Sequence, residues 1–453
     1  MDSAILESPP WVGYEEASSN TEELNCSPTF DRVVIGAGLV GMATAVELLR
    51  REPQASIAIL EIHAPTAGAS GRGTGLVGPR IGPAIDVLER RVGNASALRS
   101  YRASEQAVEL TTALCSELGV PWNESTQYVV ARTAAEQRTL FAQASTYRRL
   151  GIDVRMCTQK RLAHETSAPQ FGGLEYQRAA TVDPALLTGA LARRAKALGA
   201  HVYHRTPVSE IDNFRGRVRV QTGQGPVFAR SVVVATNTPT ISSIAQRVGA
   251  VVGLEVFGAL TVQSEDTELI GATGRAFVGA DSLAPFHLTR ADGSTIIGGG
   301  GARSRPAKGS RKAFDLATWD WLAQWWETAQ DGQGQKAFSH RWSGPIAVTG
   351  DGLPVVGPVA GLPDVWFMGG CGGHGLAMAA FNAAVIASSV TSSDSHSIDL
   401  PWLRSRAPGP AASRPVSVAV GALVHAKTMA MRRSQANAVK KTGERPIRTR
   451  RSQ

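Results

Sequence analysis

The chain lacks a cysteine pattern, a long apolar run and a secretory leader, and each absence argues against a class of protein. Its four cysteines form no C-x-x-C pair and have no matching histidine cluster. This spacing argues against a zinc site or a disulfide framework and favours free thiols in a reducing compartment. No stretch approaches the roughly 18 uninterrupted apolar residues of a membrane span. Because the N-terminus is acidic and lacks a basic-then-apolar layout, we expect no signal peptide and a cytoplasmic location.

The net positive charge of the chain is concentrated at its C-terminal end. The formal net charge is +9, but from Arg404 onward twelve Lys and Arg face one acid, Glu444, so the tail holds +11 and the remainder −2. A nucleic-acid-binding body is therefore not implied. Residues 404–453 are rich in Pro, Ala, Ser and Arg, which predicts a basic disordered tail with at most a short helix over 416–430.

The part of the chain that is most informative is one β-α-β pattern near the N-terminus. A short β-branched strand leads into Gly36, Gly38 and Gly41, which have G-x-G-x-x-G spacing. These glycines suit a tight turn, close approach of backbone to a pyrophosphate, and helix-on-strand packing. A helix over 39–51 then points its N-terminal N–H groups at that pyrophosphate. Glu61 follows the second strand at the position of the acid that binds a ribose 2′-OH, so the pattern predicts FAD or NAD and argues against NADP.

The rest of the chain continues with strands and helices and then changes to antiparallel strands. Strands are predicted over 127–131, 201–204, 217–221 and 227–235, and helices over 84–118, 134–150 and 181–199. Residues 250–301 alternate and include Asp292-Gly293, a hairpin signal, which predicts an antiparallel sheet in a second domain. The aromatic residues of a predicted helix over 313–330 have helical spacing, which is typical of core packing more than of a cofactor site.

Two further segments predict close contact between backbone and a cofactor. Val232–Asn237 is a strand that ends in a small-residue turn, and Val365–Met368 is a strand that feeds GGCGGHG and a helix. The second segment opens a glycine-rich turn onto a helix N-terminus, whose dipole stabilises negative charge such as that of a reduced flavin. An NAD-dependent dehydrogenase does not account for this block, so FAD ranks above NAD.

Together these blocks resemble the FAD-dependent amine and amino-acid oxidase superfamily, which includes D-amino-acid oxidase, glycine oxidase and sarcosine oxidase. The resemblance covers about residues 11–401 and is greatest for the gamma-glutamylputrescine oxidoreductase branch. It rests on the first glycine turn with Glu61 and on Ala69-Ser-Gly-Arg-Gly73, Val182-Asp-Pro184, Val232–Asn237, Trp342-Ser-Gly344, Gly350-Asp-Gly-Leu-Pro354 and Gly372-Gly-His-Gly375. Each motif is weak alone, but the set in this order is specific.

The resemblance implies an α/β fold in which a Rossmann-like FAD-binding domain of the glutathione-reductase type is interleaved with an α+β substrate domain built on an antiparallel sheet. We expect an N-terminal arm over 1–30, FAD-binding segments over 31–120, 178–240 and 345–403, substrate-domain segments over 121–177 and 241–344, and the tail over 404–453.

The resemblance also implies the residues that bind FAD. Gly36, Gly38, Gly41 and Glu61 would hold the ADP half, and Val208 would meet the adenine through its backbone. The other expected cofactor residues are Ser70, Gly71 and Arg72 near the pyrophosphate and flavin, Ala235, Thr236 and Asn237 along the cofactor, and Asp351, Gly352, Leu353, Pro354, Gly372, Gly373, His374, Gly375 and Leu376 around the isoalloxazine.

Three departures from the sarcosine oxidase pattern are informative. Sarcosine oxidases carry a lysine that binds the substrate carboxylate two residues after Gly-His-Gly, and here that position is Ala377. A small amino acid held in that way is therefore less expected. The place of their flavin-linking cysteine is about Gly344, which implies non-covalent FAD. Their oxygen-activating lysine has no counterpart near Ile296, which argues against fast reaction with oxygen.

The reaction that the resemblance implies is removal of a hydride equivalent from the carbon next to an amine nitrogen, giving an imine that water hydrolyses. His374 is a candidate to hydrogen-bond the substrate or flavin, or else a structural histidine in a tight loop. Arg80 is a candidate to bind an acidic part of the substrate, or else a solvated loop arginine. His287 and Arg290 are further candidates on the predicted hairpin. Cys371 is interpreted as a small residue that fills a turn.

Several functions therefore stay open. The first is an FAD-dependent enzyme that oxidises a primary or secondary amine, with a polyamine derivative among the candidates and oxygen or another acceptor reoxidising the flavin. The second is an amino-acid dehydrogenase with a non-oxygen acceptor. The third is a flavin-binding docking or regulatory protein whose basic tail binds an anionic partner such as nucleic acid, membrane or an acidic protein. A solvated tail without a partner is the favoured interpretation. No metal site is expected.

Overall fold

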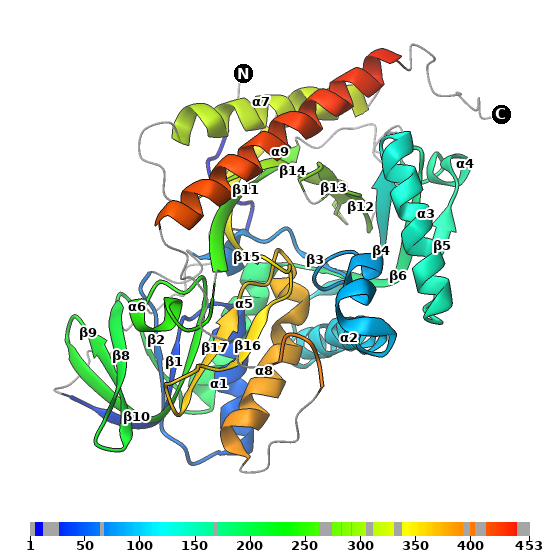
Figure 1. Cartoon of the computed structure of the whole chain (residues 1–453). Helices are drawn as coiled ribbons and strands as arrows, with labels where there is room; N and C mark the ends of the chain where they lie inside the picture. Colours follow the sequence, from blue (N-terminus) through cyan, green and yellow to red (C-terminus); the bar gives the residue numbers. More distant parts are fainter. Residues whose placement is uncertain are drawn as a thin grey trace.

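Two sheets and the helices that cover them form the protein, as the computed structural model shows (Figure 1). The structure describes residues 5–11, 27–63, 68–166, 170–249, 251–261, 274–281, 283–290, 292–304, 311–329, 338–392, 399–403 and 414–441. An eight-stranded sheet with its helices occupies the lower half of the view, and a nine-stranded sheet occupies the upper half. The predicted α/β fold class, with antiparallel strands in the second sheet, is confirmed.

The eight-stranded sheet is built on parallel strands, as the β-α-β pattern predicts. Its main path is β16 (Val355–Pro358), β17 (Val365–Gly369), β10 (Gly225–Asn237), β1 (Thr29–Ile35), β2 (Ile57–Leu60) and β7 (His201–Tyr203). All neighbours on this path pair in parallel except β16 with β17. β8 (Val208–Phe214) and β9 (Arg217–Thr222) extend it from β10 as antiparallel strands. The carboxyl ends of β1, β10 and β17 therefore lie side by side, at the kind of edge where open α/β sheets bind ligands.

Helices cover one face of this sheet and pack against one another. They are α1 (Leu39–Arg51), α5 (Pro184–Ala197) and α8 (Gly375–Thr391), and α2 (Ile85–Glu117) packs on α8. Asp183 caps α5, since its carboxylate accepts hydrogen bonds from the N–H groups of Ala185 and Leu186. Apolar side chains from α1, α5 and α8 form one buried cluster with Val34, Ile57 and Val233 of the strands, so the helices are fixed by burial of their apolar sides.

The nine-stranded sheet is mostly antiparallel. Its path is β15 (Phe338–Thr349), β11 (Val251–Thr261), β14 (Thr295–Ser304), β13 (Phe286–Thr289), β12 (Arg275–Gly279), β4 (Trp122–Ala131), β6 (Gly172–Val182) and β3 (Leu76–Val77), with β5 (Arg155–Cys157) beside β6. Among the described strands of this sheet, only β12 and β4 pair in parallel. The hairpin predicted at Asp292-Gly293 joins β13 to β14. The predicted domain boundaries stay predictions, and β6 and β15 run past those at 177 and 344.

Alternate residues of this sheet face opposite sides, and the two sides have different neighbours. We call the side of Leu260, Ile296 and Trp342 the inner face, because Trp342 contacts η1 (Ala69–Arg72), a short 3-10 helix beside the first sheet. The outer face carries Phe257 and Ile297 and is covered by α7 (Arg311–Ala329). The aromatic residues of α7 pack there, which confirms their interpretation as core.

The remaining helices are α3 (Ala134–Arg149), α4 (Gln159–Leu162), α6 (Ser242–Ala245) and α9 (Arg414–Lys441). α9 corrects the prediction of a disordered tail over 404–453, which is wrong for this segment, and it contains and extends the short helix expected over 416–430. Four of its residues at helical spacing pack against Val252 and Leu254 of β11: Val416, Val420, Val424 and Met431. Arg432 anchors the helix by donating to the carbonyl of Gly300 and the hydroxyl of Thr318. Composition predicted disorder because it does not show that an apolar stripe has a sheet to cover. The rest of the tail lies outside the described residues.

Candidate cofactor and substrate site

The first glycine turn has the geometry that its spacing predicts. Gly36 has φ +105°, a conformation that side chains disfavour, and a Cβ there would lie 2.9 Å from the carbonyl oxygen of Ala235. A Cβ at Gly41 would collide with the carbonyl oxygen of Gly36. The first glycine therefore lets β1 turn beside β10, and the third lets α1 pack on the end of β1.

The N-terminus of α1 is left free of a side-chain cap of its own. Gly38 is its N-cap residue, and the N–H of Leu39 donates to the hydroxyl of Ser70 at 2.8 Å. This bond joins η1 to the glycine turn and places Ser70, Gly71 and Arg72 next to it. An uncapped helix N-terminus at the carboxyl edge of a parallel sheet is a site for a phosphate group.

Glu61 lies at this same turn. Its carboxylate accepts from the N–H of Ala37 at 2.7 Å and from the N–H of His63 at 2.9 Å. The backbone carbonyl of Glu61 accepts from Thr206, so the chain that leads to Val208 runs beside it. The structure thus gathers the residues predicted for the ADP half at one end of β1 and β2. Their contacts with the cofactor remain a prediction.

The second glycine turn lies across β10 from the first. β17 ends at Gly369, and the turn holds Gly372 at φ +59° and Gly373 at φ +93°, with no atom within 4 Å of a Cβ built on either. His374 is the N-cap of α8 and makes no side-chain cap bond, so Gly375 and Leu376 begin the helix with open N–H groups. Burial raises the pKa of Cys371 to about 11, which agrees with its interpretation as a filler and not a nucleophile.

The end of β10 lies between the two turns and carries an unsatisfied polar atom. Ala235, Thr236 and Asn237 form this end, and Asn237 has φ +62°. Its carbonyl accepts from the N–H of Gly370 at 3.0 Å, but its buried Oδ1 has no hydrogen-bond partner among the described residues. A buried amide oxygen without a partner indicates a missing donor. The open space at the second turn, the free helix N-termini and this oxygen fit a bound dinucleotide cofactor.

The predicted block Asp351–Pro354 supports the loop that carries Arg80. The carboxylate of Asp351 accepts from the hydroxyl of Thr349 and the N–H of Leu353, both at 3.0 Å. Leu353 is buried, and a Cβ at Gly82 would lie 2.7 Å from it. This block therefore packs directly under the segment just after Arg80, and its placement at the isoalloxazine remains a prediction.

Arg80 and His374, predicted separately, lie close enough to influence each other. Burial, and next the charge of Arg80, lower the pKa of His374 to about 4. The positive charge of Arg80 also favours the ionised form of two buried tyrosines, Tyr147 on α3 and Tyr176 on β6. Their hydroxyl oxygens lie 2.9 Å apart. Burial raises the pKa of both tyrosines. Among the residues that the structure describes, none makes a hydrogen bond or ion pair with the guanidinium of Arg80. The sequence contained no signal for the tyrosines, because α3 and β6 are brought together only by folding.

The structure places His287 away from this site and so contradicts its prediction as a catalytic residue. On β13 it alternates with Phe286 and Leu288 and faces the outer side. There its ring stacks on that of Phe277, with the ring centroids 4.7 Å apart, and its centroid lies 5.4 Å from that of Trp326. It is fully buried, and burial lowers its pKa to about 3. Arg290, the other hairpin candidate, lies 3.7 Å from the carboxylate of Asp292.

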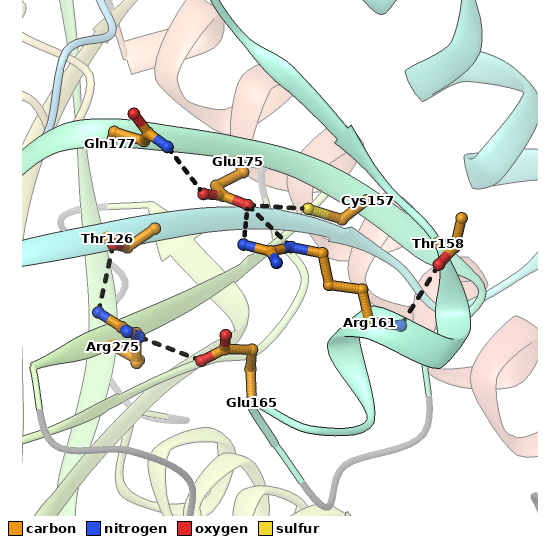
Figure 2. A network of polar contacts seen from close by, with 8 residues as sticks. All are labelled: Thr126, Cys157, Thr158, Arg161, Glu165, Glu175, Gln177 and Arg275. Atoms are coloured by element: carbon orange, nitrogen blue, oxygen red, sulfur yellow. Dashed lines mark hydrogen bonds and ion pairs between the residues drawn. The ribbon is translucent and has the colours of Figure 1, made fainter.

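A separate polar network covers the outer face near α4 (Figure 2). The buried carboxylate of Glu175 accepts from Arg161 at 2.8 Å and from the thiol of Cys157 at 3.2 Å. Arg275 of β12 pairs with Glu165 at 3.2 Å. These contacts attach the α4 segment to β6 and β12 on the side away from Arg80. The network is therefore structural support for the sheet.

The described residues contain neither a membrane-spanning helix nor a metal-binding cluster. No described helix combines the length and the hydrophobicity that crossing a membrane requires. No group of three or more His, Cys, Asp or Glu side chains in the described ranges is placed to hold a metal ion.

Comparison with known proteins agrees with this site. Residues 31–389 match the family described as DAO, FAD dependent oxidoreductase. A probable oxidoreductase OrdL of Haemophilus influenzae is 21% identical over 374 residues, 80% of this chain and 83% of the relative. An L-2-hydroxyglutarate dehydrogenase of Escherichia coli is 24% identical over 62% of this chain and 66% of its own. The crystal structure of glycine oxidase from Geobacillus kaustophilus superposes with a TM-score of 0.66 at 19% identity, covering 80% of this chain and 95% of the other.

Proposed function

The chain belongs to the DAO family of FAD dependent oxidoreductases, and on that premise we propose that it oxidises a carbon–nitrogen bond of a small amine that carries a carboxylate. One observation carries this proposal. The guanidinium of Arg80 lies near His374 at the N-terminus of α8 and has no hydrogen-bond or ion-pair partner among the described residues. A carboxylate is the planar anion that an arginine binds best, through two parallel hydrogen bonds. Arg80 would thus bind the substrate carboxylate in place of the lysine of sarcosine oxidases, whose position is occupied by Ala377 in this chain.

FAD is the cofactor, and when bound it accepts the hydride equivalent from the carbon next to nitrogen. The two uncapped helix N-termini would bind the anionic parts of the cofactor, α1 with Ser70 at the pyrophosphate and α8 at the flavin. We expect the FAD to be non-covalent, because Gly344 stands where related enzymes carry the linking cysteine.

The residues around the substrate would keep its nitrogen unprotonated. A guanidinium next to an amine disfavours the ammonium form, since like charges repel. His374, with a pKa of about 4, is neutral at neutral pH and adds no positive charge. A neutral imidazole can accept or donate one hydrogen bond, so His374 would orient the substrate without acting as a strong acid. The imine that forms is then hydrolysed by water.

A panel of paired compounds tests this proposal. The purified protein is first examined for flavin absorption that leaves the protein on acid precipitation, as non-covalent FAD requires. Anaerobic mixing then compares N-alkyl amino acids and carboxylated polyamine derivatives with their methyl esters. We expect the free acids to bleach the flavin and the esters to do so far more slowly. Equal rates for acid and ester would contradict a role for Arg80, and no bleaching by any amine would contradict oxidation of a C–N bond.

One alternative reaction has a specific observation in its favour. The relative from Escherichia coli is named as a dehydrogenase of a 2-hydroxy acid, a substrate that also carries a carboxylate for an arginine to bind. Adding 2-hydroxy acids to the panel separates this C–O oxidation from C–N oxidation. The same experiment can compare the rates at which oxygen and an artificial dye reoxidise the reduced flavin. This comparison distinguishes an oxidase from a dehydrogenase.

A further inference from the structure

The described N-terminal residues, 5–11, lie along the edge of the nine-stranded sheet. Leu6 forms a parallel bridge with His340 of the edge strand β15, and its N–H donates to Ser339 at 3.0 Å while its carbonyl accepts from Arg341 at 2.9 Å. Glu7 pairs with Arg341 at 2.6 Å. These contacts hold the arm to β15 and bring Trp11 over the inner face.

Two tryptophans that are far apart in the sequence donate hydrogen bonds to consecutive carbonyls of η1. The indole N–H of Trp11 donates to the carbonyl of Gly71 at 2.8 Å, and that of Trp342 donates to the carbonyl of Arg72 at 3.2 Å. The two rings meet edge to face with their centroids 5.8 Å apart, a favourable aromatic geometry. Trp342 is buried, and it fits only because residue 258 is glycine: a Cβ there would lie 2.7 Å from the indole.

η1 is short and packs between α5 and β15. It is a four-residue 3-10 helix whose N-cap makes no side-chain hydrogen bond, and short helices of this kind have poor hydrogen-bond geometry. On its other side Ser70 accepts the N–H of Leu39 at the first glycine turn. The cofactor turn, α5 and the two indoles therefore hold η1 in place.

We propose that Trp11 and Trp342 form an indole clamp that positions η1 for FAD binding, so that the N-terminal arm is a working part of the cofactor site. The proposal rests on the assignment of Ser70, Gly71 and Arg72 to the cofactor site under the proposed function. A binding segment that is already ordered loses less entropy when its ligand arrives. Loss of either indole donor should therefore weaken FAD binding and leave the rest of the fold intact.

The test uses Trp11→Phe and Trp342→Phe, which keep an aromatic ring and remove the N–H donor. Trp122→Phe is the matched control, because the Trp122 indole also donates one hydrogen bond, to Ser116 at 2.9 Å, but at the start of β4 on another part of the sheet. Apo protein is titrated with FAD, and flavin fluorescence reports the dissociation constant. One lost hydrogen bond should raise this constant about five- to tenfold in each clamp variant and less than twofold in the control.

Thermal unfolding with and without FAD separates positioning from simple stability. The clamp variants should show a smaller rise in Tm on adding FAD than the wild type, while Trp122→Phe shows the same rise. Wild-type FAD affinity in both clamp variants would overturn the inference and leave the proposed function intact. So would a lower Tm in the apo protein with an unchanged FAD-dependent rise. A wild-type protein that binds no FAD would overturn the proposed function itself.

Discussion

The inner and outer faces of the nine-stranded sheet are made by the same strands but have different chemistry. The inner face has glycine at Gly258 and Gly344, where a Cβ would lie 2.7 Å from Trp342 and 2.9 Å from Arg72. The outer face is filled by stacked rings, Tyr128 on Phe277 at 5.0 Å and Phe277 on His287 at 4.7 Å. One face is shaped to let other segments approach closely, and the other is closed by α7 and α4.

The role of a polar residue on or beside this sheet therefore depends on the face that it borders and not on its type. Arg80 lies near His374 and near Tyr176 of the inner face, and its guanidinium has no hydrogen-bond or ion-pair partner among the described residues, so Arg80 is available for a ligand. On the outer side, Arg161 donates a hydrogen bond to the carboxylate of Glu175, and His287 is buried among aromatic rings. We therefore expect inner-side changes to affect FAD or substrate, and outer-side changes to affect stability.

The largest expected effect is that of Arg80→Gln. Loss of the guanidinium should lower kcat/KM for carboxylated substrates about 100-fold, because a charge-assisted bidentate contact is lost. The esters should be nearly unaffected. Arg90→Gln is the matched control, since Arg90 is exposed and its ion pair among the described residues is with Asp86, one helical turn away. Steady-state kinetics measures both variants, and an equal loss for acids and esters would contradict carboxylate binding.

The next effect is on the pH dependence of stability and concerns His287. Its folded-state pKa of about 3 lies below the usual 6.5, so below pH 6.5 the unfolded chain takes up a proton that the folded chain does not. The contribution of His287 to the free energy of unfolding is thus fully present above pH 6.5 and is lost as the pH falls towards 3. When the pH is lowered from about 7.5 to about 5, this histidine should lower the free energy of unfolding of the wild type by about 2 kcal/mol.

His287→Phe should remove that acid loss and leave kcat/KM unchanged. Urea unfolding at both pH values measures the difference, and His164→Phe, which replaces an exposed histidine, serves as the control. A wild-type pH dependence in His287→Phe would show that other groups cause the acid sensitivity. A large fall in turnover would return His287 to the active site and break the distinction between the two faces.

A smaller effect is expected for Glu175→Gln in the outer network. The change keeps the shape of the side chain but removes the charge that Arg161 faces, and Arg161 is half exposed. The free energy of unfolding should therefore fall by about 1 kcal/mol. FAD affinity should not change. Denaturant unfolding and FAD titration measured on the same sample would test both statements, and weaker FAD binding would count against purely structural support.

The smallest effect is expected from removing residues 442–453, which keeps α9 on the sheet. The segment carries Arg445, Arg448, Arg450 and Arg451 against Glu444. If it is a solvated extension, turnover and flavin reduction should equal those of the full chain at low salt. A loss of turnover with a natural electron acceptor would support the docking function that the basic tail left open.

Much of the fold could be predicted because its signals are local. The glycines of both turns, the strand before each and the helix after each are neighbours in sequence, and backbone geometry follows from such neighbours. The hairpin at Asp292-Gly293 and the aromatic helix α7 were predicted for the same reason. The tail was mispredicted because a helix with an apolar stripe is stabilised by the surface it covers, which composition does not reveal.

The Rossmann-like cofactor fold with its two glycine turns can be inferred from the sequence, because the permitted backbone conformations at Gly36 and its neighbours are local properties. Folding of the whole chain places Arg80 near His374 and two tyrosines and turns His287 to the outer face. It also brings Trp11 to η1 beside Trp342. The face of a strand residue and the partner of a distant loop depend on register and packing across the whole chain. Those are set by burial of the two sheets together and are not written in any single segment.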